Sequence, residues 1–380
     1  MLAAATVVAG AFAPAAAGDA LRRGVDVYLF LIGMLALGEF AQRDGLFAWV
    51  AVRAIRASGR SRLRLFAIVY AVGIATTALL SNDATIVVLT PAVLHALARY
   101  DAPPLPYVVA CAMVANAASF VLPISNPANL LVFAGRMPSL AHWFEAFALP
   151  ALIAIAVTFG MLVWRFSRDL RGRAEHAEVA DVPPPSRAGV ALLAGSALTL
   201  IAVSAREGPL GAATFACAAA VWLFALARRR DDALAIVRQM DWRIVPLTAA
   251  LFVIVAAIDA GGALEVARAA LLWCAQLPFP GASLAAGTLA GLASNAVNNL
   301  PVALAAGETL PVLAARHPIA HAVLVGVNLG PNLSANGSLA TILWLGILRR
   351  NGIVLSGRAF VLIGLAIAPP ALLAALLAVR

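Results

Sequence analysis

Amide and hydroxyl side chains interrupt otherwise apolar stretches at four places in this sequence, and the interruptions form two pairs. Residues 81–85 read Ser-Asn-Asp-Ala-Thr and return at 294–299, an offset of 213 residues. Residues 125–129 read Ser-Asn-Pro-Ala-Asn and return at 336–338, 210 residues after Asn126. Such groups cap helix ends, and half-helix N-termini offer free donors to an oxygen-rich or anionic ligand. Paired interruptions are typical of transporters whose discontinuous helices meet at the substrate site.

The candidate substrate-binding residues share one property, a polar side chain at one of these interruptions. They are Ser81, Asn82, Thr85, Ser125, Asn126, Asn129, Ser294, Asn295, Asn298, Asn299, Asn332, Ser334, Asn336, Ser338 and Thr341. Irregular backbone survives at membrane depth only where it lines a cavity or is buried in protein. The alternative for each motif is a purely structural role as a cap of a buried helix end. Recurrence in both halves favours binding, and a group that caps can also bind.

Asp83 is the exception among the 18 acidic residues, nearly all of which fall in loops or at the ends of apolar spans. Carboxylates inside a membrane are costly and are functional candidates by default, and burial favours their protonated form. We therefore predict that Asp83 carries a coupling proton. As an alternative, it permanently accepts backbone N–H bonds as a cap. Glu308 is a weaker candidate for the proton, and Ala296 stands at the matching place in the later interruption.

The composition places the chain in a membrane. It has 380 residues, of which 63% are hydrophobic and 12% are charged, against roughly 25% charged residues in a soluble domain. The net charge of +9 comes with 27 basic residues, all of them Arg. They lie in loops and form no face with aromatic partners, which argues against nucleic-acid binding. The three cysteines and five histidines show no ligand spacing, so we expect no metal and no cofactor.

Apolar runs of about 20 residues, the length of a membrane span, recur along the chain and predict an all-α polytopic fold. The predicted spans are 2–17, 25–41, 105–135 (broken), 143–165, 188–204, 209–227, 243–260, 318–348 (broken) and 356–378. Two re-entrant hairpins, 65–80 with 84–98 and 278–293 with 297–313, are predicted to turn back at their polar tips. The first span could also be read as a signal peptide, but no basic segment precedes it.

The distribution of Arg predicts that the two halves are inverted. Residues 53–64 and 165–187 are rich in Arg, which marks the cytoplasmic side. The counterpart of the first of these segments, 266–277, contains only Arg268. The loop before the last helix of each half shows the opposite bias, with Arg136 alone in the first half and three Arg residues in the second. This topology predicts a cytoplasmic amino terminus and an outer carboxyl terminus.

The predicted divisions follow from these spans. They are a first helix at 1–19, one repeat at 20–165 (hairpin tip 81–85, broken helix 123–129), a linker with two helices at 166–237, and the inverted repeat at 238–380 (hairpin tip 294–299, broken helix 332–338).

Four segments, 80–91, 124–129, 294–301 and 329–345, are together similar to the arsenite efflux permeases of the ArsB family within the ion transporter superfamily, which also holds NhaD-like antiporters. The most specific is the last, Leu-Gly-Pro-Asn-Leu continuing through Gly-Ser-Leu-Ala-Thr-Ile-Leu-Trp-Leu. The resemblance covers about residues 20–378. It implies the ion-transporter fold and efflux of As(OH)₃ or Sb(OH)₃ across the inner (plasma) membrane in exchange for protons.

Two departures from the family pattern leave the substrate and the coupling ion open. Asn328 stands where the family often has an acid, and Asn332 where it often has a basic residue. A sodium-coupled anion permease for sulfate or dicarboxylates, or a sodium–proton antiporter, is the alternative. The absence of Arg near any interruption favours a neutral substrate over a dicarboxylate. An intramembrane enzyme would need a nucleophile–base set, which a lone Asp83 does not provide. The sequence leaves open a homodimer and a cytoplasmic ATPase partner.

Overall fold

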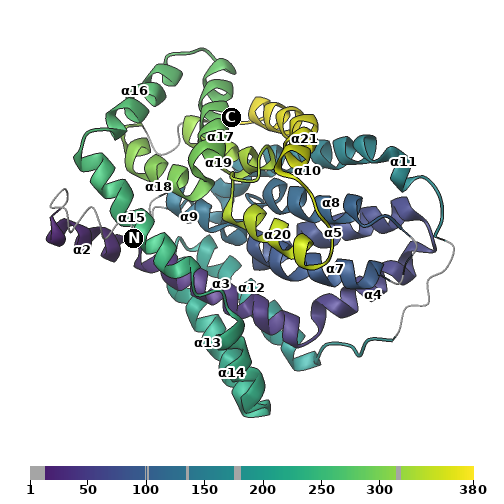
Figure 1. Cartoon of the computed structure of the whole chain (residues 1–380). Coiled ribbons are helices and arrows are strands. Elements are labelled where there is room, and N and C mark those ends of the chain that lie inside the picture. Colours follow the sequence, from purple (N-terminus) through teal and green to yellow (C-terminus); the bar gives the residue numbers. More distant parts are fainter. Residues whose placement is uncertain (1–12, 99, 101, 134–136, 175–180, 314–317) are drawn as a thin grey trace.

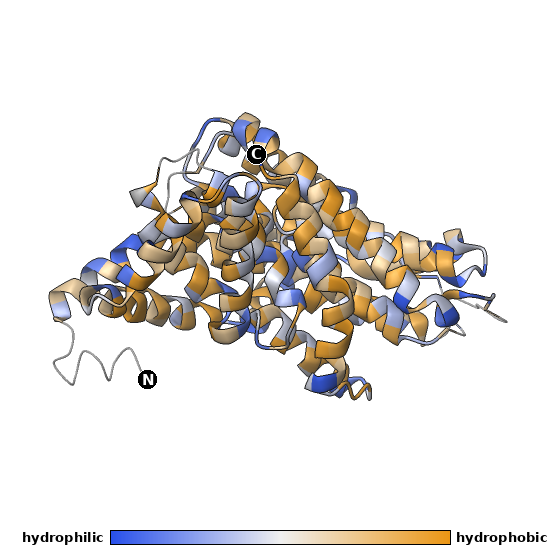
Figure 2. Cartoon of the chain, turned by 90° about the horizontal axis from the view of Figure 1, so that it is seen from above, coloured by the Kyte–Doolittle hydropathy of each residue, from blue (hydrophilic) through white to orange (hydrophobic). Residues whose placement is uncertain are grey.

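The computed structural model describes residues 13–98, 100, 102–133, 137–174, 181–313 and 318–380. Within these ranges the chain is almost entirely helical, and its only extended pairing is an isolated antiparallel bridge between Ser61 and Arg173. Seven helices of this part are long and apolar enough to cross a membrane. Apolar residues cover the long helices, and hydrophilic residues gather at helix ends and at points among the helices (Figure 2). The predicted all-α fold is confirmed, and the protein is a multi-pass membrane protein.

The helices of the first half and of the linker are shown in Figure 1. In the first half they are α2 (Pro14–Arg23), α3 (Val25–Arg43), α4 (Leu46–Ser58), α5 (Arg62–Leu80), α6 (Asn82–Ala84), η1 (Thr85–Leu89), α7 (Thr90–Leu97), α8 (Leu105–Ala117), η2 (Pro123–Ser125), α9 (Pro127–Val132) and α10 (Leu140–Arg165). In the linker they are α11 (Ser167–Leu170), α12 (Arg187–Ala205), α13 (Leu210–Arg228) and α14 (Arg230–Gln239), the last of which crosses the predicted boundary at 237.

The second half repeats the order of hairpin, broken helix and long final helix. Its helices are α15 (Ile244–Ala260), α16 (Leu264–Ala275), α17 (Gly281–Val297), α18 (Asn299–Thr309), η3 (Leu310–Val312), α19 (Pro318–Leu329), η4 (Gly330–Asn332), α20 (Leu339–Arg350) and α21 (Gly357–Leu377). The final helices of the two halves, α10 and α21, pack against each other.

The first hairpin reverses direction inside the protein. By length and composition α5 could cross a membrane, yet the chain turns at Ser81 and comes back through η1 and α7. The hydroxyl of Tyr100, just after α7, lies 3.3 Å from the Ser58 hydroxyl, which precedes α5. Tyr107 donates to the carbonyl of Arg62, at the start of α5 (3.1 Å). Both ends of the hairpin therefore lie on the same side, as predicted.

One side chain, that of Asn129, stabilises the break in the broken helix of the first half. After α8 ends at Ala117, the α-helix is interrupted until α9 begins at Pro127, and only the short 3-10 turn η2 lies between them. The Asn129 amide nitrogen donates to the carbonyls of Ser119 (2.9 Å), Leu122 (3.3 Å) and Pro123 (3.2 Å). A helix end leaves such carbonyls without partners, and lipid cannot satisfy them. Asn129 thus stabilises the irregular backbone, which is its structural role.

In the second half, α17 and α19 approach so closely that only glycine fits between them. A Cβ on Gly326 would lie 2.0 Å from the carbonyl oxygen of Gly287, and one on Gly330 would lie 2.5 Å from the Cα of Gly291. Gly287 and Gly291 lie four residues apart on α17, as do Gly326 of α19 and Gly330 at the start of η4. Such a spacing of small residues is common where helices pack closely in membranes. This contact fixes the second hairpin against the second broken helix.

Replacing Gly326 with Ala should therefore destabilise the protein. Forcing an extra carbon into a well-packed interface costs about 1–3 kcal/mol, and we expect a lower melting temperature for the purified protein in detergent, followed by intrinsic fluorescence. The matched control is Gly195→Ala in α12, where a Cβ would have no heavy atom within 4 Å. Equal melting temperatures for the Gly326→Ala variant and the native protein would contradict this packing role.

Several Arg-rich segments lie together on one face. Arg60 donates to the carbonyl of Ala174 (2.8 Å), which ties the α4–α5 loop to the linker after α10. Arg43, at the end of α3, lies 3.8 Å from Asp232 in α14. We call this side, with the ends of α3, α10 and α13, the Arg-rich face. α2 and α16 lie at the other end of the molecule, which we call the opposite face (Figure 1).

In the described part of the chain, three helices of ten or more residues occur where the sequence patterns predicted none. α4, α14 and α16 are short or charged, so they do not read as spans. In α4 the side chains of Phe47 and Ile55 are buried while Arg53 and Arg56 are exposed, a pattern of helices that lie along a membrane interface. Most of the predicted span 2–17, and Arg136, lie outside the described residues.

Candidate functional site

All four interruptions meet around one small central cavity of about 20 Å³, which is large enough for one water molecule. Its polar lining comes from both hairpin tips and both broken helices, and consists of Asn82, Asp83, Asn126, Asn299 and Ser338. The rest of the wall is apolar and includes Leu31 of α3, Ile244 of α15 and Leu300 of α18. The convergence expected from the sequence is thus present in the fold.

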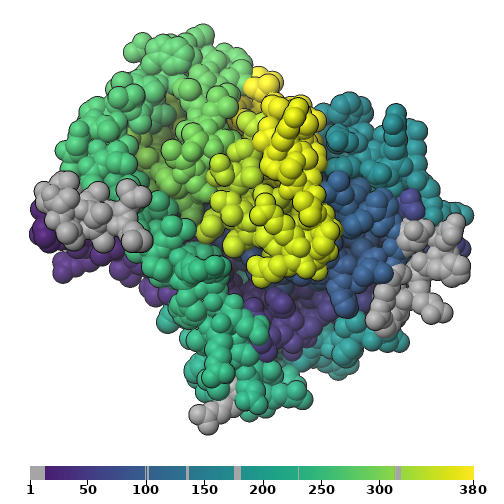
Figure 3. Space-filling model, viewed as in Figure 1, coloured from purple at the N-terminus to yellow at the C-terminus, as the bar shows by residue number. Residues whose placement is uncertain are grey.

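A larger cavity of about 670 Å³ connects this region with the Arg-rich face. Ser81, Asp83 and Pro127 line its deep end, while Asp241 and Arg350 line it near the Arg-rich face. The segment around residues 239–244 and the end of α20 border the cavity, and the surface is hollowed between them (Figure 3). We call it the inner cavity. Because Asp83 lines both cavities, the carboxylate stands where the two meet.

The two hairpin tips have similar backbone geometry. The residues that share this geometry are not separated by the 213 residues that pairing identical residue types predicted. Ser81 (φ 105°, ψ 160°) and Asn298 (φ 81°, ψ 152°) both have positive φ and both cap the returning helix. From position 81 to position 298 the offset is 217 residues, not 213. Asn82 therefore corresponds to Asn299, which lines the same cavity. By the same offset Asp83 corresponds to the apolar Leu300 rather than to Ala296.

In the broken helices, too, the residues that correspond in structure differ from the pair that the sequence predicted. Asn126 (φ −153°, ψ 132°) accepts from the N–H of Ala128 (2.9 Å) and so caps α9. Ser338 (φ −145°, ψ 153°) accepts from the N–H of Thr341 (3.1 Å) and so caps α20. The counterpart of Asn126 is thus Ser338, 212 residues later, and not Asn336. Asn336 is exposed and lies outside the central cavity's lining.

Asn82 presents an unused acceptor to the central cavity. The residue is 3% exposed, and its side-chain oxygen is buried without a hydrogen-bond partner among the described residues. Such an orphaned atom is rare in folded proteins because it costs free energy. Asn82 lies between Asp83 and Ser81, and Ser81 is a non-glycine residue with positive φ. Strained backbone of this kind clusters at functional sites. A ligand with hydroxyl or N–H donors would satisfy the side-chain oxygen of Asn82.

Asp83 does not act as the cap of the first hairpin. The N–H of Ala84 is bonded instead to the hydroxyl of Ser81 (3.4 Å). Within the described part of the chain, the Asp83 carboxylate has neither a hydrogen-bond partner nor an ion-pair partner. The geometry leaves the carboxylate available to a proton or a substrate, which is what the coupling hypothesis requires.

The two halves are tied together by asparagines that the sequence analysis did not assign to the site. Asn328 of α19 accepts from the Asn126 amide (2.8 Å) and donates to the oxygen of Asn129 (3.0 Å). In return, Asn116 of α8 donates to the oxygen of Asn332 (2.8 Å). Residues 116 and 328 are separated by the same 212 residues as the helix caps. That recurrence of Asn could have identified the pair from the sequence.

Other candidate residues are engaged in bonds that hold the tips and the breaks in shape. At the hairpin tips, Thr85 bonds to Thr77, Ser294 to the carbonyl of Ala290, and Asn298 to the carbonyl of Asn336. Asn295 bonds to the carbonyls of Gly291 and Gly330 and to Ser334. At the broken helices, Ser125 accepts from the N–H of Leu122, and Thr341 bonds to Ser338. None of these side chains lines the central cavity. Their role as ligands stays a prediction.

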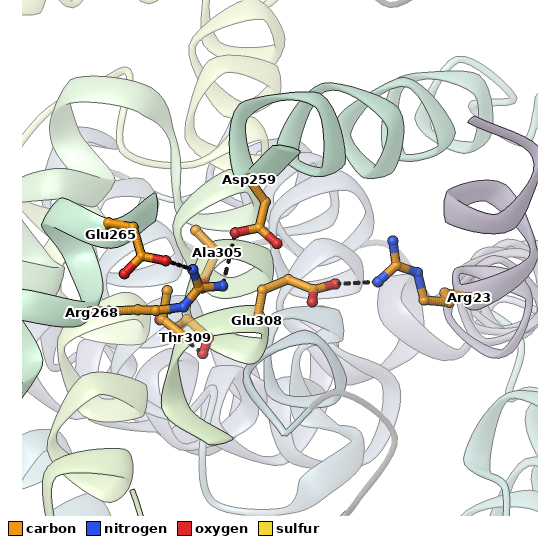
Figure 4. A network of polar contacts seen from close by, with 8 residues as sticks. Arg23, Asp259, Glu265, Arg268, Ala305, Glu308 and Thr309 are labelled. Atoms are coloured by element: carbon orange, nitrogen blue, oxygen red, sulfur yellow. Dashed lines mark hydrogen bonds and ion pairs between the residues drawn. The ribbon is translucent and has the colours of Figure 1, made fainter. Parts of the chain in front are cut away.

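Glu308 lies away from the central cavity, in a polar network on the opposite face (Figure 4). It pairs with Arg23 at 3.1 Å, and nearby Arg268 pairs with Asp259 (2.8 Å) and Glu265 (2.6 Å). The first ion pair joins the end of α2 to the returning arm of the second hairpin. Glu308 is therefore placed to hold that arm in position rather than to exchange a proton with Asp83.

Comparison with known proteins agrees with this architecture. The family model described as "Citrate transporter" (CitMHS) matches residues 1–326. The arsenical pump membrane protein of Yersinia enterocolitica is 29% identical over 343 residues, covering 86% of this chain and 79% of the relative. Its counterpart from Escherichia coli K12 is 28% identical with the same coverage. The predicted resemblance to arsenical permeases is confirmed.

A solved structure supports the fold. The YdaH transporter of Alcanivorax borkumensis, described as having an unusual topology, superposes with a TM-score of 0.56 at 17% identity, covering 95% of this chain and 86% of the other. Two re-entrant hairpins, two broken helices and a matching family model over most of the sequence lead to one conclusion. The chain belongs to the citrate transporter (CitMHS) family and is a multi-pass membrane transporter.

Proposed function

We propose that this protein exports a small neutral oxyacid, arsenite or antimonite, from the cytoplasm in exchange for protons. The observation that carries the proposal is the polar lining of the central cavity, which offers amides, a hydroxyl and one carboxylate. Asp83 is the only charged residue in that lining among the described residues. Trihydroxy acids such as As(OH)₃ present donors and acceptors without charge, so they match the chemistry of these groups. Because the cavity holds about one water molecule, the tips must move apart to admit such a substrate. The names of the arsenical pump relatives support this choice.

Citrate and other polyanions fit the central cavity less well. A substrate with several carboxylates is normally bound by Arg or Lys side chains, and no Arg lines this cavity. Asp83 would add repulsion. The N-termini of α9 and α20 meet at the cavity and could attract an anion. For this reason a sodium-coupled anion permease is the second candidate.

In the proposed cycle the structure corresponds to a state open toward the cytoplasm. The inner cavity leads from Asp83 to the Arg-rich face, which we assign to the cytoplasm because Arg-rich loops mark that side. Substrate enters from this face and displaces the coupling proton. The hairpin tips then expose the central cavity to the opposite face, where substrate leaves and Asp83 takes up a proton. We place the protein in the inner (plasma) membrane.

Transport into everted vesicles separates the two candidates. Arsenite or antimonite should accumulate when a pH gradient, acid inside, is imposed, and citrate and sulfate should not. Sodium should have no effect on the rate. Accumulation of citrate or sulfate driven by a sodium gradient, without movement of metalloid, would instead establish the anion permease.

The proposed orientation gives a topology prediction. In a variant with Cys111, Cys217 and Cys274 replaced, a cysteine at Arg229 should react with a membrane-impermeant maleimide only in everted vesicles. A cysteine at Phe279, which is 61% exposed on the opposite face, should react only in intact cells or spheroplasts. Both positions lie outside the membrane helices, so both should react fully after detergent treatment. Labelling of both from one side would contradict the inverted arrangement.

A further inference from the structure

The wall of the inner cavity carries a second carboxylate, Glu39, close to the Asp83 hairpin tip. Glu39 and Asp83 line the same cavity, and α3 passes directly against the tip. A Cβ on Gly38 would lie 3.7 Å from the Cβ of Ala84. Glu39 follows Gly38 on α3, nearer to the Arg43 end of the helix at the Arg-rich face. The two carboxylates are thus successive polar groups along one path.

The Glu39 side chain is poorly satisfied for a buried carboxylate. It is 12% exposed, and its oxygen Oε1 is buried without a hydrogen bond. Arg43, one helical turn away, places Nε 3.4 Å from that oxygen, but this nitrogen also lacks a hydrogen bond. A buried ion pair stabilises a fold only when good geometry and further hydrogen bonds offset the loss of hydration. Stability alone therefore gives a weak reason for a carboxylate here.

From these observations we infer that Glu39 transfers protons between Asp83 and the Arg-rich face, an inference that rests on the proton-coupled export proposed above. The proton leaves the Asp83 carboxyl group, which becomes a carboxylate when substrate binds. It passes through water in the inner cavity to the Glu39 carboxylate, which then releases it at the Arg-rich face. Glu39 returns to its original state, so it changes the rate of proton release and not the number of protons moved.

The charged surroundings of Glu39 suit a transient acceptor. The groups that face it or its cavity are Arg43 on its own helix, Asp83 at the hairpin tip, Asp241 and Arg243 before α15, and Arg350 at the end of α20. Asp232 of α14 reaches it only through Arg43, at 3.8 Å. Arg43 stabilises the carboxylate after the proton leaves, and Asp241 is engaged by two hydrogen bonds from Arg243 (2.7 Å each). Glu39 is left as the carboxylate between Asp83 and the cytoplasmic water.

The test uses the full chain in everted vesicles with a pH gradient and arsenite. Glu39→Gln should lower the initial rate of uptake about 100-fold, the lower end of the effect typical when a positioned proton-transfer group is lost. The final accumulation should equal that of the native protein, because Asp83 still carries the proton. Glu39→Asp should restore most of the rate. A higher concentration of phosphate buffer on the Arg-rich side should also restore the rate of Glu39→Gln.

Controls separate this inference from the proposed function. Glu145→Gln, an exposed change at the other end of the molecule in α10, should transport normally, and the amount of each variant in the membrane is measured by immunoblot. If Glu39→Gln transports at the normal rate while Asp83→Asn shows no proton-driven uptake, the role of Glu39 is overturned and the proposed function still stands. A slow Glu39→Gln variant that neither buffer nor Asp rescues would also overturn it. Absence of proton-driven uptake by the native protein would remove the proposed function and this inference together.

Discussion

Replacing Asp83 with Asn is expected to abolish proton-driven accumulation of substrate while leaving slow equilibration in place. Asn keeps the size of the side chain and much of its hydrogen-bonding capacity, but it cannot bind and release a proton. Asn82, Asn126, Asn299 and Ser338 remain around the central cavity, so substrate can still bind and cross. Internal and external concentrations should become equal and stay equal, whatever pH gradient is imposed.

The measurement is uptake of arsenite by everted vesicles with and without a pH gradient. Asp169→Asn, an exposed change in α11 at the Arg-rich face, is the matched control and should accumulate substrate like the native protein. If Asp83→Asn still concentrates arsenite when a pH gradient is imposed, another group carries the proton. Glu308 would then be tested next, although its ion pair with Arg23 argues for a structural role.

Asn82→Ala should cause the second large effect, a loss of affinity for the substrate. The side-chain oxygen of Asn82 is the buried acceptor that lacks a partner in the central cavity. Removing it leaves a hydroxyl of the bound substrate unsatisfied, which costs about 1–3 kcal/mol, or roughly 5- to 150-fold in affinity. We expect KM for arsenite to rise by that factor, measured from initial rates in vesicles at a fixed pH gradient.

The control for this experiment comes from the other half of the chain. Asn336 carries the same side chain at an interruption, but it is exposed and lies outside the central cavity's lining. Asn336→Ala should therefore leave KM close to the native value. Equal KM values for the Asn82→Ala variant and the native protein would show that substrate binds elsewhere, and the amides at the tips would then be structural caps only.

The positions of the irregular backbone could be predicted from the sequence because proline and clustered polar residues disfavour a continuous helix inside an apolar stretch. The sequence did not predict which residues correspond. Matching Ser81 with Ser294 pairs identical letters, whereas the tip requires a residue that tolerates positive φ. Asn298 meets that requirement, since Asn is found at positive φ more often than most residues other than glycine. The backbone geometry therefore shows which residues of the two hairpin tips correspond, and Asp83 corresponds to Leu300.

Residues that act across the two halves were missed for a different reason. Asn116 and Asn328 sit inside apolar helices, and only the folded chain shows that each reaches the broken helix of the opposite half. Glu39 lies near the end of a predicted span, where charged residues are common. Its relation to Asp83 depends on the position of α3 beside the hairpin tip, which hydropathy does not encode.

The pairing of Asp83 with Leu300 has a consequence for the energy available to the proposed exporter. Only one of the two tips carries a group that can hold a proton, so one proton would enter for each neutral molecule that leaves. Each cycle then moves one positive charge inward, and export is electrogenic. A membrane potential of 100 mV supplies about 2.3 kcal/mol per charge, which corresponds to about a 50-fold concentration ratio. Cells would expel the solute even where inside and outside have the same pH.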